Sequence, residues 1–169
     1  MIRSLEDKTP RIAESAFISE SAYVVGDVEI GENSGVWPGA VIRADNELVK
    51  IGENTQIEDN VVLHGGLTPI EIGNNVLIGH SAMVHAIKIG NEVLIGANAT
   101  ILHNVEIGDS CVIAGGAVVP EGMKIPGGSF VAGVPAKIKG EATSEQLSWI
   151  EKGVPAYAKL MRTFKEQGL

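Results

Sequence analysis

An aliphatic residue recurs every six positions along most of this chain. The pattern can be followed over twenty positions, and every residue at these positions except Leu63 is β-branched. Two nine-residue steps and one five-residue step interrupt the period. Neither an α-helix nor an alternating strand has a period of six, so the pattern predicts a stack of structural repeats. The positions are Ile12, Ile18, Val24, Ile30, Val36, Ile42, Ile51, Ile57, Leu63, Ile72, Ile78, Val84, Ile89, Ile95, Ile101, Ile107, Ile113, Val119, Ile125 and Val131.

The residues between the aliphatic positions predict a corner in each repeat. A small residue usually stands four positions after the aliphatic one, and glycine often follows it directly. Asn or Asp, which tolerate left-handed backbone, often stands three positions after it: Asp27, Asn33, Asn54, Asn60, Asn75, Asn98 and Asn104. Each hexad is therefore expected to be a short strand plus a corner. Three hexads then close one triangular coil, and the aliphatic side chains stack inside about 4.8 Å apart.

This signature predicts an all-β fold, a parallel β-helix shaped as a triangular prism. The chain resembles the family of left-handed parallel β-helices, and this resemblance implies the hand, because crossovers between parallel strands are otherwise right-handed. We expect the β-helix domain to occupy residues 1–140, with a lead-in over 1–11 and coils from about Ile12 to about Ile138. The two nine-residue steps predict short outward bulges near residues 45–50 and 65–71.

Residues 141–169 have a different period and predict a C-terminal helix packed on the prism. Thr143 and Gln146 form a capping-box pattern. Gly153 and Pro155 are expected to divide the segment into two helical pieces. Such a helix would cover one prism face and is compatible with helping to close a subunit interface. The apolar stripe at helical spacing comprises Leu147, Ile150, Tyr157, Leu160, Met161 and Phe164.

Composition excludes several classes of partner. The net charge of −8 argues against a nucleic-acid surface or a basic membrane patch. No apolar run is long enough to span a membrane, and no signal peptide is recognisable. The single cysteine, Cys111, falls at a small inward position and is expected to be a packing residue; one cysteine also fits a reducing, cytoplasmic setting.

Three of the four histidines fall within one irregular stretch of the repeat. His64 and His85 each come one residue after a hexad start, on the same face in successive coils. They should form an outward column above Arg43, about one strand spacing apart, which is close enough to share a metal ion. His80 lies on the preceding face above Asp59, and a corner separates it from His85, so it should be too far away to bind the same ion.

A symmetric trimer would unite these ligands. If the face carrying His80 packs against a neighbour's face carrying His64 and His85, cyclic symmetry creates three equivalent sites. Any one of these histidines alone would be taken for a solvated surface residue, but their clustering favours a shared metal site. His103 lacks such a partner pattern and is expected to be a surface residue.

At these residues the chain resembles the γ-class carbonic anhydrases. The resemblance lies in the segments VIRAD (41–45), EDNVVLH (58–64) and IGHSAMVH (78–85) and in the C-terminal helix. It implies a homotrimer whose interfaces bind Zn²⁺ through His64, His80 and His85, although Fe²⁺ or Co²⁺ also accept three imidazoles. It further implies a lyase that hydrates CO2 reversibly to bicarbonate by a metal-bound hydroxide.

The resemblance also implies supporting residues. Arg43 and Asp45 match the Arg-x-Asp of the family, and Asp59 matches an acidic residue that pairs with the arginine across the interface. Tyr157 matches a tyrosine near the end of the family's chains, although Lys159 replaces the asparagine two positions later.

Three departures lie near the expected metal. Glu58 replaces a usual glutamine, Asn46 replaces a glutamate of the family prototype, and the short segment GGLTPIE (65–71) replaces a long acidic loop. Glu58 can hold or deprotonate the reacting water, or its charge can oppose formation of hydroxide, and the sequence leaves both alternatives open. Without the acidic loop, slow proton export, low activity or a different hydrolytic substrate is compatible with the sequence.

Two other functions compete with this one. An acyl-CoA thioesterase or acyltransferase can use the same fold, and a catalytically weak trimer can serve as a structural or binding module. Three clustered histidines and the lack of a large insertion argue against acyl transfer, which normally needs one histidine base. A metal-dependent thioesterase stays open.

Overall fold

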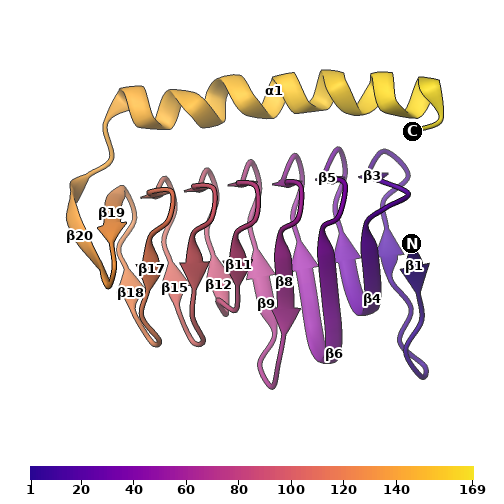
Figure 1. Cartoon of the computed structure of the whole chain (residues 1–169), viewed down its shortest axis with the longest axis horizontal. Helices are drawn as coiled ribbons and strands as arrows, with labels where there is room; N and C mark the ends of the chain where they lie inside the picture. Colours follow the sequence, from indigo (N-terminus) through magenta and orange to yellow (C-terminus); the bar gives the residue numbers. More distant parts are fainter.

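A left-handed parallel β-helix forms the body of the molecule, and one long helix lies along it (Figure 1). The computed structural model describes all of residues 1–169. The elements are β1 (Ile2–Arg3), β2 (Arg11–Ile12), β3 (Phe17–Ile18), β4 (Tyr23–Ile30), β5 (Gly35–Val36), β6 (Val41–Ile51), β7 (Gln56–Ile57), β8 (Val62–Gly65), β9 (Ile70–Ile72), β10 (Leu77–Ile78), β11 (Met83–Val84), β12 (Lys88–Ile89), β13 (Leu94–Ile95), β14 (Thr100–Ile101), β15 (Glu106–Ile107), β16 (Val112–Ile113), β17 (Val118–Val119), β18 (Lys124–Ile125), β19 (Ser129–Gly133), β20 (Ala136–Glu141) and α1 (Ser144–Gln167).

The strands stack into three faces, which we call A, B and C. Face A comprises β1, the first parts of β4 and β6, and then β8, β11, β14 and β17. Face B comprises β2, the last parts of β4 and β6, and then β9, β12, β15 and β18. Face C runs from β3 through β5, β7, β10, β13 and β16 to β19 and β20. The long strand β6 passes through the first predicted bulge at the corner between faces A and B, and the loop between β8 and β9 forms the second.

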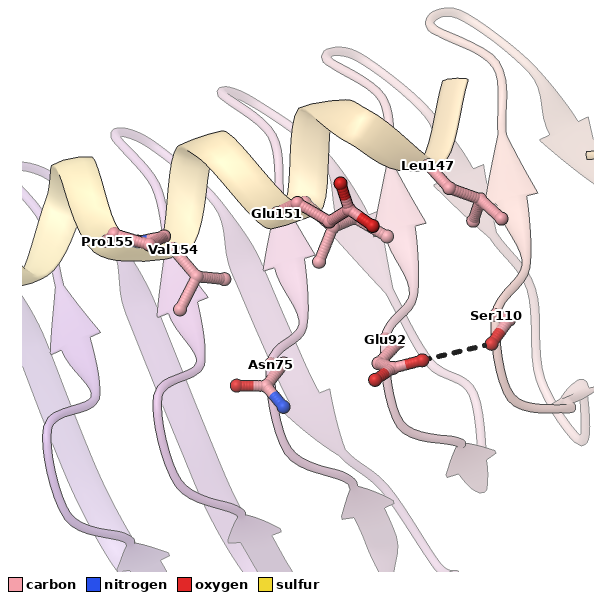
Figure 2. A pocket seen from close by; sticks show the side chains of 8 residues that line it. Asn75, Glu92, Ser110, Leu147, Glu151, Val154 and Pro155 are labelled. Atoms are coloured by element: carbon pink, nitrogen blue, oxygen red, sulfur yellow. Dashed lines mark hydrogen bonds between the residues drawn. The ribbon is translucent and has the colours of Figure 1, made fainter. Parts of the chain in front are cut away.

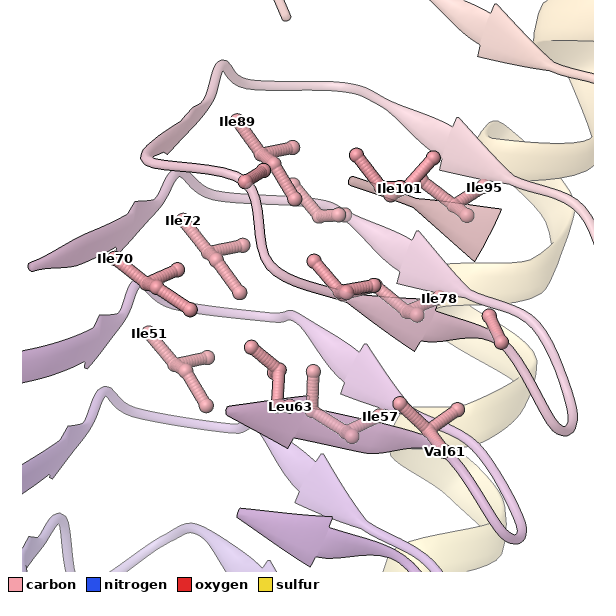
Figure 3. Packing of buried hydrophobic residues seen from close by; sticks show 14 of the residues in the cluster. Ile51, Ile57, Val61, Leu63, Ile70, Ile72, Ile78, Ile89, Ile95 and Ile101 are labelled. Carbon is pink, nitrogen blue, oxygen red and sulfur yellow. The ribbon is translucent and has the colours of Figure 1, made fainter. Parts of the chain in front are cut away.

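The aliphatic residues of the hexads form the core, as the period predicts. Every one of the twenty positions except Ile12 and Ile18 is buried. They stack in register from coil to coil, so that Ile42 pairs with Leu63 and Leu63 with Val84. Figure 3 shows this interior for the central coils, where branched side chains fill the prism. Because each coil buries its apolar side chains on the next, the core is one continuous cluster of 35 residues.

The corners follow the predicted chemistry. Six of the seven expected Asn and Asp positions have left-handed backbone, with φ between 53° and 60°. Asp27 is the exception, because Gly26 takes that conformation instead, with φ of 88°. Gly52 has a different function, since a Cβ there would lie 2.6 Å from the carbonyl oxygen of Gly73 in the next coil. Only glycine permits the coils to approach this closely.

Both ends of the prism differ from the expectation. Within the expected lead-in of residues 1–11, β1 pairs with β4 on face A and β2 already starts at Arg11 on face B. The expectation that coils continue to about Ile138 is also wrong, because the chain reverses after Gly133 and β20 returns antiparallel to β19. This hairpin covers the open edge of the last coil, which would otherwise offer unpaired backbone groups.

The segment after the prism is a single helix. The capping box of Thr143 and Gln146 is present, as predicted. The predicted break is wrong, because α1 continues through Gly153 and Pro155 to Gln167. Gly153 permits a close contact instead of a break, since a Cβ there would lie 2.7 Å from the Cδ1 atom of Leu77. The structure has no helix with the length and apolar character that crossing a membrane requires.

Helix α1 covers face C along β5, β10 and β13. Its last turns pack on Phe17 and Trp37, whose rings lie 5.1 Å apart, and the Tyr157 ring also lies 5.1 Å from Trp37. Met161 is buried in this cluster, whereas Leu160, expected in the same stripe, faces solvent with 41% of its surface exposed. Faces A and B therefore remain uncovered within one chain (Figure 1).

Candidate metal site

His64 and His85 lie side by side on face A, as their column predicts. His64 is in β8 and pairs in register with Arg43 of β6, and His85 directly follows β11. Their ring centroids are 5.1 Å apart, and the ring planes are nearly perpendicular at 84°. Consecutive coils of the prism thus place the two imidazole rings on one surface, and the spacing between adjacent strands determines their separation.

Arg43 and Asp45 surround the His64 ring. The Arg43 guanidinium contacts the Asp45 carboxylate at 3.1 Å and His64 Nε2 at 2.8 Å, and the same carboxylate lies 3.2 Å from that nitrogen. Arginine only donates, so His64 Nε2 accepts from it when the ring is neutral with its proton on Nδ1. A metal ion would use this same lone pair and would displace the Arg43 guanidinium from it.

His85 lies in an environment that disfavours the charged form of its ring. Its Nδ1 atom is buried and has no hydrogen-bond partner. Burial lowers the pKa of the imidazole, and the neighbouring His103, His64 and Arg43 lower it further. Metals bind the neutral form of the ring, so this environment suits coordination.

His80 lies in the turn between β10 and β11, at the corner where face C meets face A. Two carboxylates from the coil before it hold the ring: Glu58 Oε2 is 3.1 Å from Nε2, and Asp59 Oδ2 is 3.0 Å from Nδ1. The backbone amide of His80 also donates to Glu58 Oε2, at 3.1 Å. Carboxylates that hold the second nitrogen of an imidazole are typical partners of metal-binding histidines.

Tyr157 of α1 completes this edge of face A. Burial raises the pKa of its phenol, and hydrogen bonding to Glu58 and the charges of Glu58 and Asp59 raise it further. The structure therefore gathers Glu58, Asp59, His80 and Tyr157 at one edge of face A. It gathers Arg43, Asp45, His64 and His85 toward the other edge. Within one chain, no three His, Cys, Asp or Glu side chains lie close enough to hold a metal ion.

The expectation that the whole face carrying His80 packs against a neighbouring chain is wrong. The strands before His80 belong to face C, and α1 of the same chain lies on β5 and β10 of that face, so face C cannot pack flat against a neighbour. His80 nevertheless remains accessible, because it lies in the turn beyond β10 with 55% of its side chain exposed. A neighbouring chain can meet the corner of the prism but not the face under α1.

His103 has a partner that the column argument missed. Its ring centroid lies 4.3 Å from that of His85, with the planes inclined by 35°. His103 is exposed, as expected, and its ring contact with His85 was not predicted. It stands two residues after its hexad start and His85 only one, and their side chains lean together across adjacent coils. The signal available in the sequence was that Val84 and Ile101 occupy the same face one coil apart.

A groove of about 310 Å³ lies on the other side of α1, at the corner between faces B and C (Figure 2). Glu92 and Ser110 of adjacent coils face each other there at 3.2 Å, and Glu151 of α1 lies above them. No histidine lines this groove, so it is separate from the candidate metal site. The lining residues are Asn75, Glu92, Ser110, Leu147, Ile150, Glu151, Val154 and Pro155.

The coils and the corner chemistry define a hexapeptide-repeat protein. The family described as "Bacterial transferase hexapeptide (six repeats)" matches residues 9–44 and 86–121. A relative named "Probable carbonic anhydrase" from Methanocaldococcus jannaschii is 40% identical over 91% of this chain and 98% of its own length. "Gamma carbonic anhydrase 1, mitochondrial" from Arabidopsis thaliana is 37% identical over 91% of this chain, which spans 58% of that relative.

A solved structure of a "putative acetyltransferase" from Bacillus cereus matches 98% of this chain and 97% of its own, with a TM-score of 0.94 and 33% identity. The named relatives and the hexapeptide repeats indicate the same family. The chain belongs to the γ carbonic anhydrase-like family of hexapeptide-repeat, left-handed β-helix proteins.

Proposed function

We propose that this protein is a homotrimeric, metal-dependent enzyme that hydrates CO2 reversibly to bicarbonate at its subunit interfaces. The observation that carries the proposal is the placement of the three histidines. His64 and His85 lie together toward one edge of face A, and His80 lies at the opposite edge between two carboxylates. Around a threefold axis, one edge of each face A would meet the opposite edge of the next.

The outward residues of the three faces support face A as the interface. Face C is under α1. Face B carries a column of alternating charge, which suits solvent: Arg11, Glu29, Lys50, Glu71, Lys88, Glu106 and Lys124. Face A instead carries a mostly apolar column beside the histidines: Tyr23, Val41, Val62, Met83, Thr100 and Val118. Val62 is 39% exposed and Tyr23 37% exposed, so these side chains are available to a neighbour.

In this proposal the two edges supply different parts of each site. His64 and His85 of one chain and His80 of the next would hold Zn²⁺, or alternatively Fe²⁺ or Co²⁺, and the bound ion would supply Lewis-acid activation of water. Asp59 orients His80 through Nδ1. Arg43 is next to His64 and would face Asp59 of the neighbouring chain, so this charge pair would hold the two edges in register.

The proposal includes a modest turnover rate. Asn46 has no titratable group, and its side-chain amide donates to the carbonyl of Gly66 at 3.5 Å in the short loop after β8. No carboxylate stands in that loop between Gly65 and Ile70 to relay protons to solvent. Proton export therefore depends on buffer, and the rate should increase with buffer concentration.

The test is CO2 hydration measured by stopped flow on anaerobically purified protein, with the metal content determined on the same sample. Activity should follow the metal content, disappear with a chelator and be absent in His85→Ala. Lys88→Ala on face B is the matched control and should behave like the wild type. A fully loaded trimer that hydrates CO2 no faster than buffer would exclude this function and leave a thioesterase or a structural or binding trimer.

Acyl-CoA chemistry is the second candidate. The Bacillus cereus structure, with its acetyltransferase title, is similar over nearly the whole chain. A thioesterase can use the same activated water, because hydrolysis of a thioester needs no acceptor pocket. Turnover of acetyl-CoA and longer acyl-CoA esters by the same preparation separates the two candidates. A cytoplasmic setting also belongs to this proposal, and the single free cysteine, Cys111, is compatible with it.

A further inference from the structure

Glu58 is a nearly buried carboxylate whose only charged partner is a histidine. Glu58 as a whole residue is 8% exposed, and the single ion-pair contact of its carboxylate is with His80. Asp45 has the Arg43 guanidinium at 3.1 Å, and Asp59 is 40% exposed to water. A buried carboxylate needs a cation or several hydrogen bonds to offset the loss of hydration. Glu58 accepts a hydrogen bond from the backbone amide of His80, but of the three acidic side chains here it is the most buried and has no permanent cation beside it.

The contacts of His80 show where that cation would be. A neutral imidazole has one N–H group and one lone pair. If Nδ1–H donates to Asp59 at 3.0 Å, the lone pair of Nε2 points toward Glu58 Oε2 at 3.1 Å. Two acceptors at this distance repel each other unless a proton or a metal ion lies between them. Zinc–nitrogen and zinc–oxygen bonds total about 4.1 Å, so both atoms are within the span of one ion.

We propose that Glu58 is a fourth protein ligand to the interfacial metal, so that each site has three histidines and one carboxylate. This inference rests on the proposed function, because it takes the three histidines as the other ligands. A glutamine at this position has a neutral amide and binds metals weakly. The carboxylate adds a hard, anionic oxygen ligand, which favours Fe²⁺ and Co²⁺ relative to a purely nitrogen site.

The fourth ligand has a consequence for metal choice. A four-coordinate ion is filled by three histidines and Glu58, with no position left for water, whereas an ion that accepts five or six ligands keeps one open. The Zn²⁺ form of the wild type should therefore be less active than the Fe²⁺ or Co²⁺ form. Replacing Glu58 with glutamine should remove that difference.

The test uses the intact protein, stripped of metal and reloaded anaerobically with Co²⁺. Four-coordinate Co²⁺ absorbs visible light much more strongly than five- or six-coordinate Co²⁺, so the spectrum reports the number of ligands without any assay of activity. The wild type should give the weak spectrum and Glu58→Gln the strong one. In competition with a chelator, Glu58→Gln should bind Co²⁺ at least about tenfold more weakly, the lower end of what even indirect partners of metal ligands contribute. Glu71→Gln on face B, which also removes one carboxylate, should match the wild type.

Each outcome decides a different claim. Equal spectra and affinities for the wild type and Glu58→Gln would overturn the fourth ligand and leave the proposed function intact. Failure of both proteins to bind Co²⁺ would exclude the histidine site, and the fourth ligand with it. If Glu58→Gln does not fold, a crystal structure of the Co²⁺-loaded wild type decides: a Glu58 oxygen bonded to the ion supports the inference, and one beyond bonding distance refutes it.

Discussion

The thiol of Cys111 shows how the interior of the prism controls the chemistry of one residue. The side chain is completely buried, and its Sγ atom donates to the carbonyl of Pro126 at 3.1 Å. Burial raises the pKa of the thiol, and the negative charge of Asp109 adds to the effect. A raised pKa means less thiolate at any given pH, and the thiolate is the reactive form.

We therefore expect alkylation of Cys111 by iodoacetamide at pH 8 to be more than about tenfold slower in the native protein than in urea, since the buried thiol forms less thiolate and is shielded from the reagent. Labelling followed by mass spectrometry measures both rates. Equal rates would mean that the thiol is accessible and would contradict a packing role.

The energetic cost of removing Arg43 distinguishes a contact within one chain from a contact between chains. Within one chain, its contact with Asp45 is half-exposed, and such a pair contributes about 0–1 kcal/mol. If the neighbouring Asp59 also pairs with it in a buried interface, removing it costs on the order of 3–5 kcal/mol. Arg43→Ala should then make the trimer dissociate at a concentration at least about a hundredfold higher, as measured by analytical ultracentrifugation.

The control is Lys124→Ala, which removes an exposed ion pair with Glu106 on face B. It should leave the oligomer unchanged. An Arg43→Ala protein that dissociates at the same concentration as this control would exclude the intersubunit pair.

Much of the candidate site was predictable at this scale, because the period assigns each residue to a column. The neighbours Arg43 and His64, and Asp59 and His80, are in the predicted relationship. The period does not determine the directions of side chains. It therefore missed the contact of His103 with His85 and gave no indication that Glu58 reaches both the amide and the ring of His80.

At the scale of elements, the charged column of face B explains why strands of only two residues can stay exposed there. Glu71 of β9 lies in register between Lys50 of β6 and Lys88 of β12. Opposite charges on neighbouring strands attract, and each pair contributes about 0.2–1 kcal/mol. The alternation also protects the face from association with a second copy, because an edge or face of mixed charge is poorly suited to strand pairing.

Glu71→Lys should lower the free energy of unfolding by roughly 1–2 kcal/mol, because two attractive pairs become two repulsive ones. Thermal unfolding at low and high salt measures this, and the effect should shrink in high salt. Glu71→Gln, which only removes the charge, should cost about half as much. Because face B is outside the proposed interface, neither variant should change the trimer, and dissociation of Glu71→Lys would show that face B is buried between subunits.

Helix α1 shows which features of an element local sequence patterns can predict and which they cannot. Its start was predictable from the capping box, which is a local hydrogen-bond pattern. Its continuity through Pro155 was not, since the cost of one missing helical hydrogen bond is offset by packing against β10 and β13, which lie far away in sequence. The closing hairpin of β19 and β20 was missed for the same reason, because antiparallel pairing at the end of the prism depends on the open edge of the last coil.

At the scale of the whole molecule, each of the three faces has a distinct environment. Face C is covered by α1, face B is charged, and face A combines apolar side chains with the histidines. The repeat predicted the prism, but the allocation of faces depends on where α1 lies, and its amphipathic pattern does not identify the face that it covers. In the proposed function, a trimer with face A inward would bury this exposed apolar surface and complete the ligand set.

That arrangement predicts complementation between two inactive variants. His80→Ala and His64→Ala should each lose metal binding, because every site in either homotrimer lacks one ligand. In a mixed trimer, one interface joins an intact His80 from the His64→Ala chain to an intact His64 from the His80→Ala chain. Random assembly of equal amounts should restore about a quarter of the sites, since three quarters of the trimers are mixed and each has one intact interface. The two proteins are unfolded together and refolded with Co²⁺, and bound metal and CO2 hydration are then measured.

Mixing His80→Ala with His85→Ala should give the same recovery, whereas His64→Ala with His85→Ala should give none, because both substitutions are on the same side of the interface. If mixed trimers are confirmed by native mass spectrometry and hold no more metal than the separate variants, the site is not shared between chains.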